Sequence, residues 1–192
     1  HLAAGAKRVV ITAPAKDADG AEGKTILMCV NEDAMKSVVL TSNGSCTTNA
    51  SSPVIQIMVE NPGIEKAFLA TVHGYTATQN LVDGPVRGGN DFRRGRAAAQ
   101  NISPSTTGAA LSVTRAIPEL EGKFDGLAYR VPIATGSLAD ITFIAKRSVT
   151  VDEINDIFRK AAAEPRWQGV LAVTEDQVVS SDVIGIPYGA LV

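Results

Sequence analysis

Cys46 is the residue of this chain with the clearest potential as a nucleophile. It lies among hydroxyl side chains in residues 45–49 (Ser-Cys-Thr-Thr-Asn), directly before apolar residues that recur at helical spacing. A thiol reacts as its thiolate, and the free N–H groups of a helix start or a neighbouring imidazolium lower its pKa from about 8.5 to roughly 3.5–7.5. Because Ser and Thr clusters also cap helices, the pattern favours a nucleophile and a purely structural residue about equally.

His73 is the candidate general base. It is the only histidine besides His1, and it follows the apolar run of residues 68–72. A lone histidine at the end of a strand is more often a structural residue than a catalyst. It gains a catalytic role only if the fold brings it to Cys46, because a cysteine–histidine pair must be close in space and not in sequence. The residues alone leave this pair as a hypothesis.

Hydroxyl side chains and one arginine form a third candidate group. They occupy the ends of expected strands or the starts of expected helices, where hydroxyls, guanidinium groups and backbone N–H groups can bind phosphate. Each also has a simpler structural role, such as capping the helix that follows. The group consists of Ser45, Thr47, Thr76, Thr106, Thr107 and Arg130.

The elements that would position these residues change character along the chain. Apolar runs at residues 7–12, 25–31 and 38–40 predict short buried strands, and continuous apolar strands suit a parallel sheet covered on both faces. After Cys46, helical spacing predicts a helix that ends before residues 61–63 (Asn-Pro-Gly). Long strands with helices on one side follow, which predicts an α+β domain.

The chain after residue 66 supplies the other elements of this expected domain. Residues 150–153 (Thr-Val-Asp-Glu) match a capping box, which opens a further helix. Residues 80–96 are rich in Gly and Arg and predict an irregular segment. Strands are expected at residues 67–75, 127–131, 138–145, 170–173 and 177–181, and another helix at residues 107–116.

Composition excludes several classes of function. Hydrophobic residues make up 45% and charged residues 20%, as in ordinary soluble globular proteins, and the net charge of −2 gives no reason to expect nucleic acid or an anionic membrane as partner. No apolar run approaches the roughly 20 residues of a membrane-spanning helix. The two cysteines form neither a disulfide framework nor a zinc spacing, so we expect no metal and a reducing cytoplasm. Cys29, in an apolar run, is interpreted as a small core residue.

Several segments, taken in order along the chain, resemble one family. The resemblance begins with residues 42–49 around Cys46 and residues 71–79 around His73. It continues through residues 101–110, 117–120, 129–132 and 178–182. Together these segments resemble the phosphorylating glyceraldehyde-3-phosphate dehydrogenases along nearly the whole chain.

The resemblance implies a reaction and roles for its residues. Cys46 would attack the aldehyde carbon of glyceraldehyde 3-phosphate, and His73 would take the thiol proton and stabilise the oxyanion. A thioester forms as hydride leaves for the nicotinamide, and inorganic phosphate then releases an acyl phosphate. Two phosphate sites are implied: Thr76 and Arg130 would bind the phosphate of the substrate, and Ser45, Thr47, Thr107 and Gly108 would bind the attacking phosphate.

The resemblance also implies a domain arrangement, a cofactor and an assembly. Residues 1–41 would be the last strands of an α/β Rossmann domain, with Thr12 near the cofactor, and residues 42–192 the catalytic domain, truncated at its C-terminus. The family's Gly-rich fingerprint would precede His1, so we expect the 192 residues alone to be inactive. The cofactor is NAD, with NADP left open. The intact protein is expected to be a cytoplasmic homotetramer.

Departures from the family pattern and two rival functions limit the resemblance. Ala50 replaces a second cysteine found in many members, Ile133 stands where threonine is usual, and the segment at residues 80–96 is slightly longer. An erythrose-4-phosphate dehydrogenase is disfavoured by the Thr-Thr-Gly-Ala-Ala run at residues 106–110. A non-catalytic binding or scaffold member is disfavoured by the joint presence of Cys46, His73 and Arg130.

Overall fold

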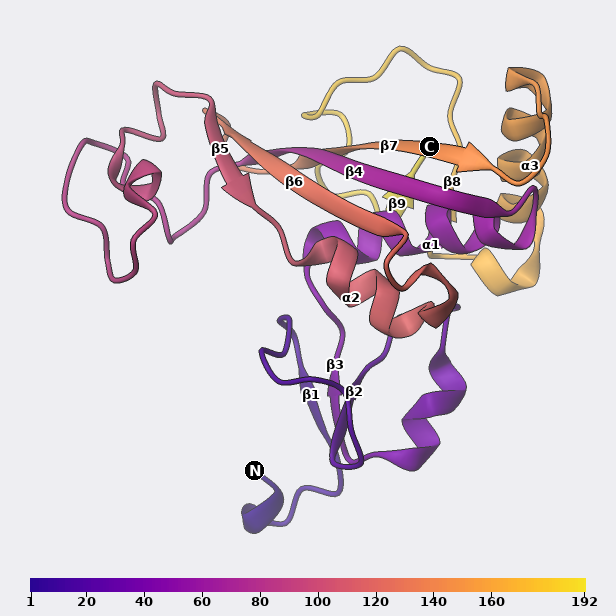
Figure 1. Ribbon diagram of the computed structural model, residues 1–192, viewed down its shortest axis with the longest axis horizontal. Helices are drawn as coiled ribbons and strands as arrows, with labels where there is room; N and C mark the ends of the chain where they lie inside the picture. Colours follow the sequence, from indigo (N-terminus) through magenta and orange to yellow (C-terminus); the bar gives the residue numbers. More distant parts are fainter.

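The computed structural model describes residues 1–192 and contains a small N-terminal sheet and a larger sheet, separated by two packed helices (Figure 1). The small sheet has the order β1-β3-β2 and consists of β1 (Val9–Ile11), β2 (Gly23–Thr25) and β3 (Leu40–Ser42), all parallel. The expected parallel sheet is therefore confirmed. Its expected cover on both faces is wrong for this chain, because Val10 is 63% exposed.

The expected strand at residues 25–31 is wrong beyond Thr25. Leu27 to Val30 form a turn, and Cys29 adopts a left-handed conformation with φ 63°. The side chain of Asn31 explains this turn, because it accepts the Leu27 N–H and donates to the Thr25 carbonyl, each at 2.8 Å. A local side chain thus satisfies backbone groups that a strand would have used for its ladder.

Cys29 is accordingly a half-buried turn residue and not a fully buried core residue. Its thiol donates to the Arg166 carbonyl at 2.8 Å. The Arg166 guanidinium also donates two hydrogen bonds to the Cys29 carbonyl, from Nε at 2.8 Å and from Nη2 at 2.6 Å. The same guanidinium lies 4.5 Å from the Trp167 ring centroid and bonds to Glu60, so this turn is fastened to the C-terminal third of the chain.

The larger sheet is mixed, with the order β5-β6-β4-β7. Its strands are β4 (Ile64–Gly74), β5 (Ser103–Thr106), β6 (Phe124–Val131) and β7 (Ser137–Ala145). Strands β4 and β6 pair in parallel, whereas β5 and β7 pair antiparallel with their neighbours. The strands expected at residues 67–75, 127–131 and 138–145 are confirmed, and the register sets His73 opposite Arg130.

Helices cover one face of this sheet, as the α+β prediction requires. Both α1 (Cys46–Glu60) and α2 (Ala109–Ala116) contact the strands, and α3 (Val151–Ala163) packs against α1. The core between helices and sheet includes Ile55, Met58, Leu69 and Val113, all fully buried. Each such side chain contributes about 1.5–3 kcal/mol through burial. The three expected helices are thus confirmed, and the Thr150 hydroxyl caps α3 by accepting the Glu153 N–H at 3.2 Å.

The other face of the sheet is not covered in this chain. Side chains alternate between the two faces of a strand, and several of the residues that alternate with the core positions are large and apolar. Val72, for example, pairs with both Tyr129 and Leu138 across the sheet, and all three are exposed. With Phe68 and Ile144 they form an apolar outer face, a name used below for these five residues.

The C-terminal region adds a two-stranded parallel pair and a long connection. Strands β8 (Leu171–Ala172) and β9 (Ala190–Leu191) confirm the expected strand near residues 170–173. The strand expected at residues 177–181 is wrong. Val179 is exposed, and its N–H bonds to the Asp182 carboxylate at 2.8 Å at the start of a run of turns, so this segment is a surface loop.

Residues 80–96 are irregular, as expected, apart from one short 3-10 helix. The 3-10 helices of the chain are Leu2–Ala4, Glu32–Ser37, Phe92–Gly95, Pro118–Leu120 and Pro165–Trp167. None of the helices combines the length and the apolar character that crossing a bilayer requires.

Candidate active site

Cys46 is the first residue of α1, and the sequence before it explains why the helix begins there. Gly44 has φ 71°, a conformation that glycine adopts without strain and that turns the chain out of β3. Ser45 is extended, and its hydroxyl accepts the Thr48 N–H at 3.1 Å, which is the geometry of an N-cap. The thiol therefore lies beside backbone N–H groups that have no partner within the helix.

His73 lies near the end of β4 and faces the helices. Its Nε2 is 3.2 Å from Sγ of Cys46, so the two residues proposed as nucleophile and base are in hydrogen-bonding contact. The contact arises because α1 begins where the central strand of the larger sheet ends. The contact could not be predicted from the sequence, because Cys46 and His73 belong to different elements, α1 and β4.

The pKa of the Cys46 thiol is lowered from its ordinary value to about 7. The largest cause is the hydrogen bond to His73, which favours the thiolate. Partial burial opposes it, whereas the charge of His73 and hydrogen bonds from Thr47 add to the lowering. Near neutral pH a large share of this thiol is therefore ionised. The other cysteine behaves oppositely, because burial and the nearby Glu32 raise the pKa of Cys29.

Arg130 occupies the other side of the imidazole ring. Its Nη1 is 2.6 Å from Nδ1 of His73 and 3.1 Å from the Gly74 carbonyl oxygen, which itself lies 2.7 Å from that Nδ1. A guanidinium can only donate and a carbonyl can only accept, so the two contacts of Nδ1 favour opposite tautomers of His73. When Nε2 carries the ring proton, it directs an N–H at the sulfur of Cys46, which suits a thiolate.

A cavity of about 200 Å³ opens beside Arg130. Polar and charged residues line it, and three of them are arginines, so it fits a small anion rather than an apolar ligand. Burial is the largest cause that lowers the pKa of Arg130, and the positive charge of Arg94 adds to the lowering, whereas the charge of Cys46 opposes it. The lining residues are Thr76, Thr78, Gln79, Arg93, Arg94, Ser103, Pro104, Ser105 and Arg130.

Sequence reasoning identified Thr76 and Arg130 in this cavity but missed Arg94. The signal was present as Arg93-Arg94-Gly95-Arg96, a cluster of positive charge within the segment interpreted only as irregular. Arg93 and Arg94 both pair with Asp91, at 2.7 and 3.5 Å, and these contacts hold the short 3-10 helix that carries them. These charges indicate an anion site only once the fold places Arg93 and Arg94 beside Arg130, which the sequence does not reveal.

The remaining expected phosphate residues do not line this cavity. Ser45 and Thr47 lie at the start of α1, and Thr47 is buried beside Cys46. Thr107 and Gly108 lie at the start of α2, where the Thr107 hydroxyl accepts the Ala109 N–H at 3.1 Å. The expected phosphate residues therefore divide into two sets. The cavity set is Thr76 and Arg130, and the helix-start set is Ser45, Thr47, Thr107 and Gly108. The two helices concerned, α1 and α2, pack together.

Thr106 and Thr12 lie outside both sets. Thr106 ends β5 and is exposed. Thr12 directly follows β1 and is exposed, at the carboxyl edge of the parallel sheet. That edge also leads from Ser42 of β3 into the turn before Cys46, since Ile11 pairs with Ser42 and its carbonyl accepts the Asn43 N–H at 3.1 Å. No group of three or more His, Cys, Asp or Glu side chains is arranged to hold a metal ion.

Comparison with known proteins agrees with the family resemblance of the sequence segments. A family model described as glyceraldehyde 3-phosphate dehydrogenase, C-terminal domain, matches residues 45–192. Glyceraldehyde-3-phosphate dehydrogenases of Clostridium pasteurianum and Streptomyces coelicolor are each 48% identical to this chain, over 100% and 97% of it and over 54% of their own lengths. Glyceraldehyde-3-phosphate dehydrogenase 1 of Candida glabrata is 46% identical over 100% of the chain and 55% of its own length. The chain spans about half the length of the curated relatives it matches.

Proposed function

This chain belongs to the glyceraldehyde 3-phosphate dehydrogenase family, and we propose that it carries the catalytic half of an enzyme that converts glyceraldehyde 3-phosphate to 1,3-bisphosphoglycerate. The reaction would pass through a thioester on Cys46, with hydride transfer to NAD or NADP. One observation carries the proposal: the Cys46 thiol, with its pKa lowered to about 7, lies 3.2 Å from His73 and close to a cationic cavity.

Cys46 and His73 supply the covalent chemistry. The thiolate attacks the aldehyde carbon, and the resulting oxyanion is stabilised by the Nε2–H of His73 and by backbone N–H groups at the start of α1. When this oxyanion collapses to a carbonyl, the carbon loses hydride and becomes a thioester. Inorganic phosphate then adds to the thioester carbon, and the Cys46 thiolate leaves as the acyl phosphate forms.

The residues at the carboxyl edge of the small parallel sheet fit a nicotinamide cofactor. In open α/β sheets, ligands bind outside the carboxyl ends of the strands. Here that edge holds Thr12, and it adjoins the turn that leads to Cys46. When bound, a nicotinamide dinucleotide supplies the hydride acceptor. We assign Thr12 as a contact of this cofactor, NAD or NADP.

The two sets of phosphate residues suit two different phosphates. Thr76 and Arg130, joined by Arg94, would bind the phosphate that the aldehyde carries, because they line the cationic cavity beside His73. Ser45, Thr47, Thr107 and Gly108 would bind the attacking phosphate at the starts of two helices that pack together, because backbone N–H groups at helix starts favour anions. A phosphorylated aldehyde and a free phosphate would then flank one thiol.

The remaining assignments concern the whole protein. We propose that residues 1–41 belong to a cofactor-binding domain and residues 42–192 to the catalytic domain. The apolar outer face supports assembly into a homotetramer, since extended apolar patches on a folded surface commonly mark interfaces. The cytoplasm is the proposed location, consistent with a free thiol at the centre of the site.

Acyl-enzyme trapping on the full-length protein tests this function. With NAD and glyceraldehyde 3-phosphate but no phosphate, about one NADH per active site should form in a burst, together with a mass adduct on Cys46. Added phosphate should restore steady turnover. Cys46→Ser should abolish the burst, whereas Cys29→Ser serves as the matched control and should retain it. Turnover by the Cys46→Ser variant would contradict the proposal.

A further inference from the structure

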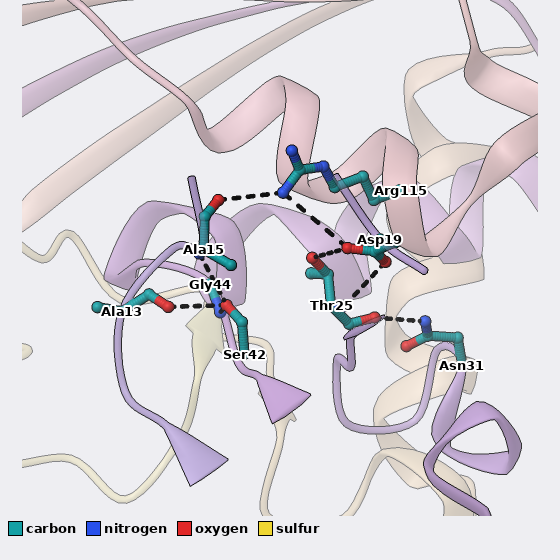
Figure 2. Close-up of polar contacts among 8 residues, drawn as sticks. All are labelled: Ala13, Ala15, Asp19, Thr25, Asn31, Ser42, Gly44 and Arg115. Carbon is teal, nitrogen blue, oxygen red and sulfur yellow. Dashed lines mark hydrogen bonds and ion pairs between the residues drawn. The ribbon is translucent and has the colours of Figure 1, made fainter. Parts of the chain in front are cut away.

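One buried hydroxyl connects the loop after β1 with the turn before the thiol (Figure 2). Ser42, the last residue of β3, is 3% exposed. Its hydroxyl donates to the Ala13 carbonyl at 2.7 Å and accepts the N–H groups of Ala15 and Gly44, each at 3.2 Å. A serine hydroxyl has one proton to donate and two lone pairs, so these contacts use its full capacity.

The turn held by Ser42 leads directly to the nucleophile. Gly44 precedes the N-cap Ser45, and a Cβ placed on Gly44 would lie 2.7 Å from Cγ2 of Thr48, so this turn is pressed against the first turn of α1. From the helix side, Asn49 donates to the carbonyls of Asn43 and Ser45, at 2.7 and 2.8 Å. Ser42 and Asn49 therefore hold the turn from its two sides.

The loop held by Ser42 has a second anchor on the catalytic side of the molecule. Arg115 of α2 donates to the Ala15 carbonyl at 3.1 Å and lies 4.0 Å from the Asp19 carboxylate (Figure 2). Asp19 in turn accepts the N–H and the hydroxyl of Thr25, at 2.8 and 3.0 Å. Ala15 is thus fixed through its N–H by Ser42 and through its carbonyl by Arg115.

We propose that Ser42 and Arg115 are positioning residues that make the reactivity of Cys46 depend on the loop at residues 13–15. A displacement of this loop pulls on the Ser42 hydroxyl, which also holds Gly44, and so shifts the start of α1 relative to His73. The hydrogen bond between His73 and Cys46 is the largest cause of thiolate stabilisation, so it is the contact that such a shift would weaken. The loop directly follows Thr12. If the proposed function holds, contact of the cofactor with Thr12 would therefore change the reactivity of the Cys46 thiol.

The first experiment compares Ser42→Ala with Ser37→Ala in the full-length protein. Ser37 is a matched control because it is exposed and its hydroxyl bonds only to Ala34 and Lys24. Iodoacetamide labelling of Cys46 is followed as a function of pH, without cofactor or aldehyde. Ser42→Ala should move the midpoint of labelling to higher pH and slow labelling below pH 7 by about 3–10-fold, since one pKa unit is a factor of ten in thiolate. Ser37→Ala should match the wild type.

A second pair of variants covers the case in which Ser42→Ala does not fold. Arg115→Met removes the bond to the Ala15 carbonyl, and Arg115→Lys retains a donor there. Arg115→Met should shift the labelling profile in the same direction as Ser42→Ala, and Arg115→Lys should restore it.

In steady-state assays, kcat should fall by about 10–100-fold for Ser42→Ala, the scale of a displacement near 1 Å at a reacting centre.

The labelling profile decides between positioning and mere support of the fold. If Ser42→Ala or Arg115→Met lowers the melting temperature but leaves the pH midpoint of Cys46 labelling unchanged, the coupling is absent and the inference is overturned. Because labelling uses neither NAD nor aldehyde, this result does not depend on the dehydrogenase assignment. Loss of NAD-dependent turnover in the wild type would instead refute the proposed function alone.

Discussion

Nη1 of Arg130 lies 2.6 Å from Nδ1 of His73, whereas Nε2 of the same ring faces the Cys46 sulfur at 3.2 Å. The imidazole is therefore held between a permanent cation and a thiol. Because the guanidinium can only donate, it favours the tautomer with the ring proton on Nε2, whereas the Gly74 carbonyl favours a proton on Nδ1. An anion in the adjoining cavity would compete with His73 for the same guanidinium, so the proposed phosphate site and the proposed catalytic pair would share one residue.

Replacing Arg130 should separate its roles. Arg130→Ala should raise KM for glyceraldehyde 3-phosphate by about 10–100-fold, the scale of one lost charge-assisted hydrogen bond. The Nδ1 proton of His73 should appear in ¹⁵N spectra, because Nδ1 can then donate to the Gly74 carbonyl. Arg96→Ala is the control, since Arg96 is exposed and paired with Asp83. An unchanged KM for the aldehyde would refute the assignment of Arg130 to the substrate phosphate.

The two cysteines should respond differently to pH. A lowered pKa means that thiolate is already present at neutral pH, so labelling of Cys46 by iodoacetamide should rise through a midpoint near pH 7 and then level off. The pKa of Cys29 is raised, so its labelling should begin only at distinctly higher pH. Peptide mass spectrometry at each pH measures both. Equal labelling rates at pH 7 would contradict the activated thiol.

Removing the imidazole should affect both the chemistry and the thiol. His73→Asn should lower kcat by about 10²–10⁴-fold, the contribution of a positioned general base. It should also move Cys46 labelling to higher pH, because the hydrogen bond to His73 is the largest cause of the lowered pKa. Stopped-flow assays and labelling profiles of the same preparation give both values. If the labelling profile does not move, the helix start alone activates the thiol.

The helix-start set should act on the attacking phosphate. Thr107→Ala should raise KM for inorganic phosphate and slow acyl transfer, while leaving KM for the aldehyde close to that of the wild type. Thr114→Ala is a suitable control, because its hydroxyl bonds only to the Ala110 carbonyl within α2. If Thr107→Ala and Arg130→Ala impair the same substrate equally, the assignment of two phosphate sites is wrong.

The apolar outer face should mediate self-association. Phe68→Glu and Leu138→Glu place charges on exposed positions of neighbouring strands, so they should disrupt an interface without removing core side chains. Sedimentation of the full-length protein should show a smaller assembly for each variant. Val151→Glu, an exposed position on α3, is the control. An unchanged assembly would show that this face lies outside the subunit contacts.

Much of the fold follows from local pattern. Helix α1 was predictable because Ser45 caps it and apolar residues recur after Cys46, and α3 because Thr150 and Glu153 form a cap. The failures occurred where one side chain outweighed a pattern. Asn31 bends an apolar run that resembles a strand, and Asp182 holds Val179 in a loop.

The site was predictable in its residues but not in its connections. Cys46, His73 and Arg130 stood out by type and setting, and the family resemblance assigned their roles. Three relationships depend on strand register and on where loops fold back onto the sheets. They are the contact between Arg130 and His73, the place of Arg94 in the cavity, and the hydrogen bonds of the Ser42 hydroxyl. These relationships join segments distant in sequence, and no local pattern encodes them.

Three contacts at the join between the N-terminal segment and the rest of the molecule use backbone carbonyls of that segment. Arg166 binds the carbonyl of Cys29, Arg115 that of Ala15, and Ser42 that of Ala13. A carbonyl is present whichever side chain its residue carries. Substitutions at residues 13 and 15 should therefore be tolerated, while Ser42, Arg115 and Arg166 carry the constraint. Through such contacts, the N-terminal segment can diverge in sequence while its alignment with the Cys46 thiol is inherited unchanged.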